Sequence, residues 1–196
     1  MKHPTFVMAL TGAALAASSA GAAPVRFDGP LPPTGGYIWF DLTAPSPAQP
    51  GTTSPSFFVL ERYRAAGHDY VELRSTMKTQ GSAIAASILG ANAVIDESLD
   101  WRPSGQPSWT IFTLLRAQKG YYEWDFSLLD IGESGFVALS FDSDAGTHYG
   151  WVELRNISMP DAKYWAYEIL AWGYETEAGV GIAAGAVPAP DALALL

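Results

Sequence analysis

Residues 135–156, GFVALSFDSDAGTHYGWVELRN, read as two β-strands joined by a tight turn. In the second half, the apolar Val152 and Leu154 alternate with Glu153 and Arg155. A period of two is typical of a strand that buries one face and exposes the other. The central DSDAG supplies Asp and Gly, which satisfy the backbone geometry of tight turns. The stretch therefore predicts a β-hairpin.

Similar runs, rich in aromatic and β-branched residues, recur along the chain between short segments that contain Gly, Pro, Asp or Ser. The expected strands cover residues 36–42, 57–63, 69–75, 108–117, 121–126, 135–141, 148–157 and 164–175. Residues 79–95 fit either a short helix or a buried pair of strands, because their small side chains give no clear period. Many short strands punctuated in this way predict an all-β fold, a single antiparallel β-sandwich of jelly-roll-like type.

A second alternating run, YVELRS at residues 70–75, places Val71 and Leu73 opposite Glu72 and Arg74. The acid and the base share one face, which we expect to be exposed to solvent. An ion pair in that position contributes little to stability.

The first 22 residues have the layout of a secretory signal peptide. Lys2 and His3 form a short basic start, residues 6–17 are apolar and rich in Ala, and small residues follow up to Ala22. A membrane anchor is the alternative, but the apolar run is short for a span of the bilayer. We expect cleavage after Ala22.

The remaining chain is long enough for one sandwich with its own core. We divide it into a sandwich domain at residues 23–186 and a short unstructured tail at residues 187–196. Of 11 Lys and Arg and 20 Asp and Glu, the signal peptide removes only Lys2, which leaves a formal charge of −10. Such a charge argues against nucleic-acid partners and against docking on an anionic membrane. The lack of cysteine excludes thiol catalysis and Cys-ligated metals.

Four short motifs follow one another in the C-terminal third of the chain. They are His148-Tyr149-Gly150-Trp151, then Gly173-Tyr174-Glu175-Thr176, then Gly181-Ile182 with Ala184-Gly185, and finally Val187-Pro188-Ala189-Pro190. In this order they resemble the C-terminal portion of bacterial exported proteins that carry a PEP-CTERM sorting tail. The resemblance makes Val187 to Pro190 the expected sorting motif.

The resemblance implies export by a Gram-negative-type bacterium, processing by an exosortase-like membrane enzyme, and delivery to the cell surface or extracellular matrix. Two features depart from the family. Ala189 stands where the motif has Glu, and the family's transmembrane helix and basic cluster do not follow before Leu196. Membrane contact is therefore expected only in transit, through the signal peptide and any further C-terminal helix.

The predicted turn also raises the question of a metal site. Asp142 and Asp144 offer oxygens and His148 a nitrogen, but calcium takes about six to eight oxygens. Zinc requires further His or Cys ligands, and among the histidines of the exported part only His68 could add one. We favour a plain hairpin and keep a calcium site at Asp142 and Asp144 as the alternative.

The chain contains 7 tryptophans, most of which we expect in the core. Trp101 and Trp109 differ, because they flank the Pro- and Gly-rich loop DWRPSGQPSW, where burial is least assured. Exposed rings of this kind stack on sugars. They predict, as an alternative function, a carbohydrate-binding module that recognises exopolysaccharide.

Evidence for catalysis is weaker. Glu123 and Asp125 share a strand face, and paired carboxylates suit glycoside hydrolysis. The run resembles the Glu-x-Asp-x-Glu pattern of laminarinase-like sandwich enzymes, but Ser127 or Leu128 occupies the place of the third acid. The sequence also lacks a nucleophile motif such as G-x-S-x-G and a phosphate-binding loop. We therefore predict a non-enzymatic exported protein with no cofactor, apart from the calcium alternative.

Overall fold

The computed structural model describes residues 23–31, 37–44, 56–65, 68–75, 82–103, 111–118, 124–157 and 167–188, and every regular element in these ranges is a β-strand. A six-stranded sheet has the order β1 (Pro24–Leu31), β12 (Tyr167–Glu175), β11 (Gly146–Asn156), β10 (Ser134–Ser143), β5 (Ser82–Leu89) and β7 (Trp101–Pro103). A five-stranded sheet has the order β2 (Tyr37–Asp41), β3 (Phe57–Ala65), β4 (His68–Ser75), β8 (Ile111–Gln118) and β9 (Trp124–Ser127).

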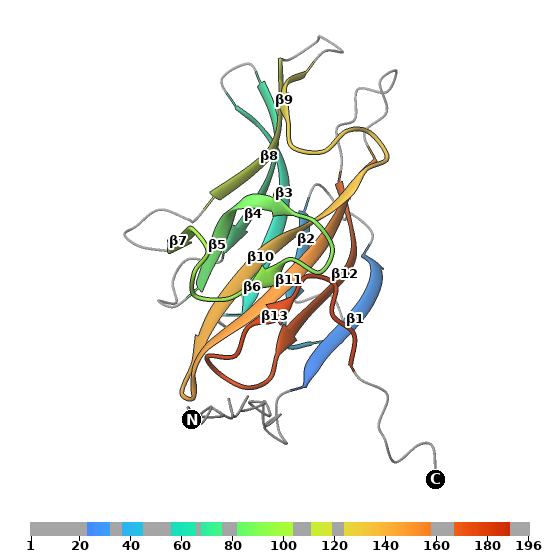
Figure 1. Ribbon diagram of the computed structural model, residues 1–196. Helices are drawn as coiled ribbons and strands as arrows, with labels where there is room; N and C mark the ends of the chain where they lie inside the picture. Colours follow the sequence, from blue (N-terminus) through green and yellow to red (C-terminus); the bar gives the residue numbers. More distant parts are fainter. Residues whose placement is uncertain are drawn as a thin grey trace, which may run out of the picture.

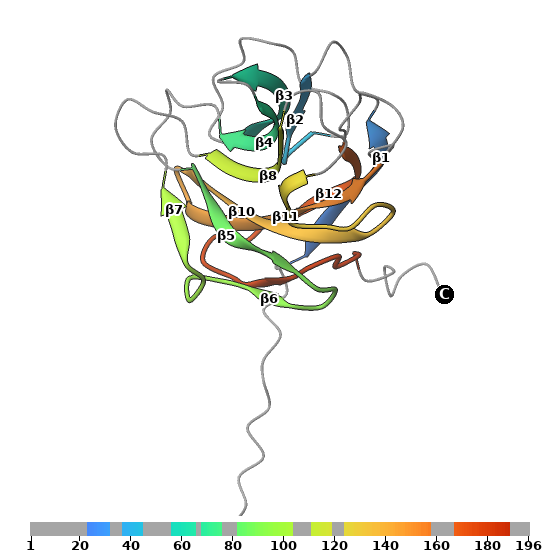
Figure 2. The same ribbon diagram turned by 90° about the horizontal axis from the view of Figure 1, so that it is seen from above.

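The two large sheets face each other, as Figures 1 and 2 show. Neighbouring strands in both sheets are antiparallel. A main core fills the space between them, and its largest apolar side chains come from both sheets. The predicted antiparallel β-sandwich is confirmed.

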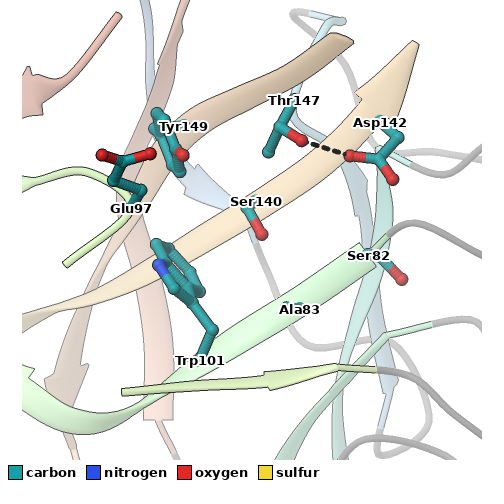
Figure 3. Close-up of a pocket in the computed structure, with 8 residues that line it drawn as sticks. All are labelled: Ser82, Ala83, Glu97, Trp101, Ser140, Asp142, Thr147 and Tyr149. Atoms are coloured by element: carbon teal, nitrogen blue, oxygen red, sulfur yellow. Dashed lines mark hydrogen bonds between the residues drawn. The ribbon is translucent and has the colours of Figure 1, made fainter. Parts of the chain in front are cut away.

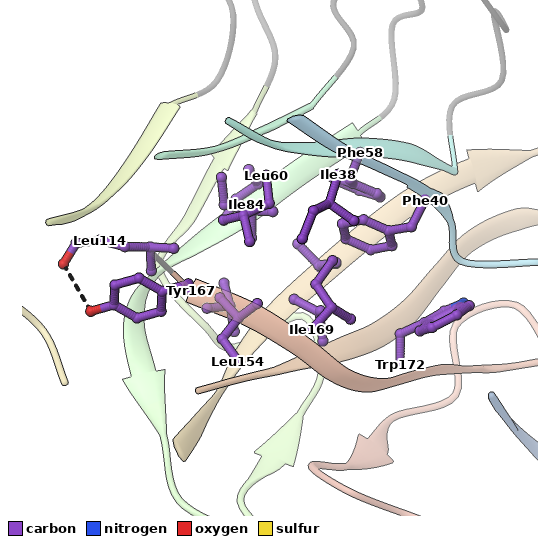
Figure 4. Close-up of a cluster of buried hydrophobic side chains, with 14 of the residues drawn as sticks. Ile38, Phe40, Phe58, Leu60, Ile84, Leu114, Leu154, Tyr167, Ile169 and Trp172 are labelled. Carbon is purple, nitrogen blue, oxygen red and sulfur yellow. Dashed lines mark hydrogen bonds between the residues drawn. The ribbon is translucent and has the colours of Figure 1, made fainter. Parts of the chain in front are cut away.

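Two aromatic side chains of β12 tie the sheets together across this core (Figure 4). Trp172 is fully buried, and its Nε1 donates hydrogen bonds to the backbone carbonyls of Asp41 and Ala44, at 3.1 and 3.2 Å. Tyr167 is also buried, and its hydroxyl donates to the carbonyl of Leu114 on β8, at 3.4 Å. The indole and phenol thus satisfy their polar atoms while their rings fill the core.

A second, smaller core lies on the opposite face of the six-stranded sheet. Here β6 (Val94–Ile95) pairs with β13 (Ile182–Ala183), and the two cover Trp151 and Phe136. Figure 2 shows this third layer on the side of the six-stranded sheet away from β2, β3 and β4. Residues 96–100 connect β6 directly to β7. The pairing of β6 with β13 therefore also fixes the position of this connecting segment.

The predicted hairpin is confirmed, with Val152 and Leu154 fully buried and Arg155 exposed. Arg155 forms its ion pair with Glu168, the residue opposite it on β12.

The predicted exposure of Glu72 and Arg74 is wrong. Glu72 is 3% exposed, and Arg74 donates to both Glu72 and Glu61, with shortest contacts of 2.8 Å. The cause is the strand register, which sets Glu61 directly opposite Glu72. One guanidinium lies between two carboxylates that would otherwise repel each other.

Candidate functional site

The β10–β11 hairpin ends in a two-residue loop, Asp144-Ala145, between the paired Ser143 and Gly146. Thr147 pairs with Asp142 across the strands, and its Oγ1 donates to Asp142 Oδ1 at 2.7 Å. This hydrogen bond occupies one carboxylate oxygen and leaves the other available.

His148 has a structural role at the base of this hairpin. Its ring is 7% exposed and stacks on Phe141, with ring centroids 5.1 Å apart. The Nδ1 atom lies 3.0 Å from the carbonyl of Glu175, so it must carry a hydrogen and donate. The Nε2 atom lies 3.0 Å from Ser143 Oγ. Both ring nitrogens are engaged, and His148 joins the hairpin to β12.

Within the ranges that the structure describes, no three His, Asp or Glu side chains are grouped so that they could hold a metal. Asp142 and Asp144 are both exposed, at the end of β10 and in the loop. The calcium site at these two residues stays a prediction.

A pocket of about 240 Å³ lies beside the hairpin, on the face of the six-stranded sheet that carries the second core (Figure 3). Strands β5, β7, β10 and β11 all contribute to its walls, together with the segment between β6 and β7. The lining residues are Ser82, Ala83, Glu97, Trp101, Ser140, Asp142, Thr147 and Tyr149.

An aromatic pair forms one wall of the pocket. The rings of Trp101 and Tyr149 stack with their centroids 5.8 Å apart and an interplanar angle of 29°. Trp101 Nε1 donates to the backbone carbonyl of Asp96 at 2.9 Å, which fixes the orientation of the indole. The ring is partly exposed and lies at the edge of the second core. It is therefore held rigidly while one part remains open to a ligand.

Trp101, which the sequence predicts to flank a loop, begins the short strand β7 and pairs with Ala85 on β5. The short strand forms since β5 offers an unpaired edge, and an edge position tolerates Pro103. Trp109, the other predicted sugar-binding tryptophan, lies outside the described residues.

Two hydroxyl groups in the pocket lack partners. Ser140 and Tyr149 are directly opposite each other on β10 and β11, and they are 6% and 7% exposed. Neither hydroxyl has a hydrogen-bond partner among the described residues, and neither oxygen is among the fully buried polar atoms, so both face the solvent-accessible space of the pocket. Both side chains line the pocket, and Figure 3 shows the Ser140 hydroxyl directed into it. A polar ligand would supply the missing partners.

The pocket is acidic. The carboxylates of Glu97 and Asp142 belong to its lining, and none of its eight lining residues is basic. Burial raises the pKa of the Tyr149 phenol above its ordinary value of 10.0, and the negative charges of Glu97, Asp96 and Asp142 raise this pKa further. The Tyr149 hydroxyl is therefore protonated at neutral pH and able to donate.

The remaining predicted residues lie elsewhere. Asp125 belongs to β9 in the five-stranded sheet, away from the pocket, and Glu123 is outside the described residues. Val187 is 61% exposed at the end of the last described range, whereas Ala189 and Pro190 lie outside it. Among the described residues there is no helix with the length and hydrophobicity to cross a bilayer.

Sequence reasoning missed six of the eight lining residues, and three of the six carry the polar chemistry used below. Glu97 occurs in the acidic run DESLD, which carries no recognisable motif. Ser140 offered a weak signal, as a hydroxyl residue at a buried position of the apolar strand GFVALSF. Tyr149 was part of a motif read for sorting rather than binding.

Comparisons with protein families, with curated proteins and with solved structures find no match to this chain. The chemistry of the pocket itself is therefore the basis for a functional proposal.

Proposed function

We propose that this chain is an exported surface or matrix protein that binds a saccharide in the pocket between Trp101 and Asp142 and leaves it chemically unchanged. The observation that carries the proposal is the pair of hydroxyls of Ser140 and Tyr149, which line the pocket beside an aromatic wall and have no partner among the described residues. A ligand that hydrogen-bonds such a hydroxyl in place of water gains about 0.5–1.5 kcal/mol per bond.

A saccharide suits this pocket in both chemistry and size. Its ring carries C–H groups that pack on an indole face and hydroxyls that pair with serine, tyrosine and carboxylate oxygens. The volume of about 240 Å³ is below the ~300–1,000 Å³ typical of sites for drug-sized ligands. One sugar unit, either terminal or within a chain, matches that size.

We expect Trp101→Ala to weaken saccharide binding about tenfold or more, because a loss of about 1.4 kcal/mol of contact energy already gives that factor. Tyr149→Phe should weaken binding while leaving the unfolding midpoint unchanged, since the hydroxyl it removes has no partner in the described residues. Titration calorimetry with a panel of polysaccharides measures both effects. Tyr37→Ala is the control, because it removes an exposed aromatic side chain from the other sheet.

Three results would contradict the binding proposal. One is the absence of binding across the whole panel. Another is equal binding by the wild type and Trp101→Ala. The third is the release of new reducing ends during incubation, because Glu97 and Asp142 would then be acting in catalysis.

Export is supported by the signal-peptide layout and by the PEP-CTERM-like motifs. We expect the mature protein, recovered from the envelope or medium of its host, to begin at Ala23. Intact mass measurement of that material tests this expectation. A mass that still includes residues 1–22 would contradict it. Release of the tail near Val187 would support processing by an exosortase-like enzyme.

A further inference from the structure

We infer that the pocket selects a cationic amino sugar, a hexosamine unit with a free ammonium group, over neutral or acidic sugars. The inference rests on the proposed saccharide function and narrows its ligand class.

The described lining of the pocket carries negative charge that no described basic residue neutralises. Glu97 and Asp142 reach the pocket from two different segments, and neither forms an ion pair with a described residue. Asp142 accepts one hydrogen bond from Thr147, which leaves its charge in place. Asp96 adds a third carboxylate close to Tyr149, and its hydrogen bonds from Ser98 hold it ionised.

The basic residue on β7 does not share the face of Trp101. Arg102 follows Trp101 on β7, and successive side chains of a strand point to opposite faces. The strand that brings Trp101 to the pocket therefore directs Arg102 away from it. Among the lining residues that the structure describes, an ammonium group entering the pocket meets carboxylates and no basic side chain.

The aromatic wall of Trp101 and Tyr149 also favours a cation. The faces of tryptophan and tyrosine rings attract cations through their quadrupoles, and the effect grows where water is excluded. In this pocket the ring pair and the two carboxylates act on the same small volume. The same field repels uronic acids and sulfated or phosphorylated sugars.

The test uses the whole protein and two oligosaccharides of equal length, glucosamine oligomers and their fully N-acetylated counterparts. These ligands share a backbone and differ in the ammonium group. We expect the glucosamine oligomer to bind at least tenfold more tightly at low ionic strength, with the difference shrinking as salt is added. The double variant Glu97→Gln/Asp142→Asn should lose this preference while it still binds the acetylated form.

A matched control removes the same charge from elsewhere. Asp28→Asn/Asp130→Asn also deletes two exposed carboxylates, one on β1 and one after β9, and should keep the preference. An equal loss in this control would overturn the inference, because the attraction would then come from the net charge of the protein.

The outcomes separate the inference from the function on which it rests. Equal binding of the two oligomers, lost in Trp101→Ala, would overturn the amino-sugar preference and leave saccharide binding standing. Binding that requires calcium and disappears with a chelator would also overturn it, since the metal would then neutralise Asp142. If neither these oligomers nor the polysaccharide panel bind, both proposals fall.

Discussion

Gly173→Ala is expected to destabilise the domain by about 3 kcal/mol or more, at the upper end of what overpacking costs. A Cβ atom at this position would lie 2.5 Å from the carbonyl oxygen of Val25 and 3.0 Å from Cζ2 of Trp151. The carbonyl belongs to β1, the strand that pairs with β12 at this point. The backbone can therefore move away only by loosening the pairing of these strands.

The measurement is the midpoint of urea unfolding followed by tryptophan fluorescence. Gly90→Ala is the matched control, since a Cβ atom there would meet no other atom within 4 Å. We expect that variant to unfold at or slightly above the wild-type midpoint, because alanine reduces the freedom of the unfolded chain. Equal midpoints for Gly173→Ala and the wild type would show that β1 does not constrain this position.

Trp172→Ala is expected to cost about 3–5 kcal/mol, the range found when a large buried aromatic side chain is removed. The indole is fully buried between the sheets and contacts the rings of Phe27 and Phe40. Its removal leaves a cavity in the main core. It also deprives the carbonyls of Asp41 and Ala44 of their shared donor.

Trp172→Phe separates these two contributions. Phenylalanine keeps much of the ring packing but cannot donate, so we expect a smaller loss of about 1–2 kcal/mol. Urea unfolding of both variants gives the comparison. If the two substitutions cost the same, the hydrogen bonds rather than the ring would account for the stability that Trp172 provides, and the packing argument would be wrong.

The sequence predicted the interior of the sandwich better than its edges. The β10–β11 hairpin was evident because Val152 and Leu154 alternate with charged residues. Strand β1 was missed because Gly29 and Pro30 interrupt it, and an edge strand tolerates such residues where its pairing is irregular, as the β1–β12 pairing is between Asp28 and Leu31. For residues 79–95 the helix alternative is wrong, since the segment forms β5 and β6. The pairing of β5 with β7 and β10, and of β6 with β13, determines the structure of this segment. Its small side chains alone do not distinguish a helix from a strand.

The site was predicted in separate parts. Trp101 was assigned to sugar binding and Asp142 to calcium, with 40 positions between them. The structure brings both to one pocket because β5 pairs with β7 on one side and β10 on the other. That order of strands depends on long-range pairing, which alternation within a strand does not encode. The buried Arg74 network was missed for the same reason, as it depends on the register of β3 against β4.

Strand β1 has its only sheet neighbour in β12, among the described residues. At the end of this pairing, Ala23 N donates to Thr176 Oγ1 and Thr176 Oγ1 donates to Ala23 O, contacts that span 153 positions of the chain. The pairing partner of β6 is also distant in the sequence, because β6 pairs with β13 near the end of the described residues. A chain that emerges from its N-terminus cannot complete its six-stranded sheet until residues 167–175 have followed, nor the β6–β13 pair until residues 182–183 have followed. We therefore expect folding of this domain to be slow and to finish late.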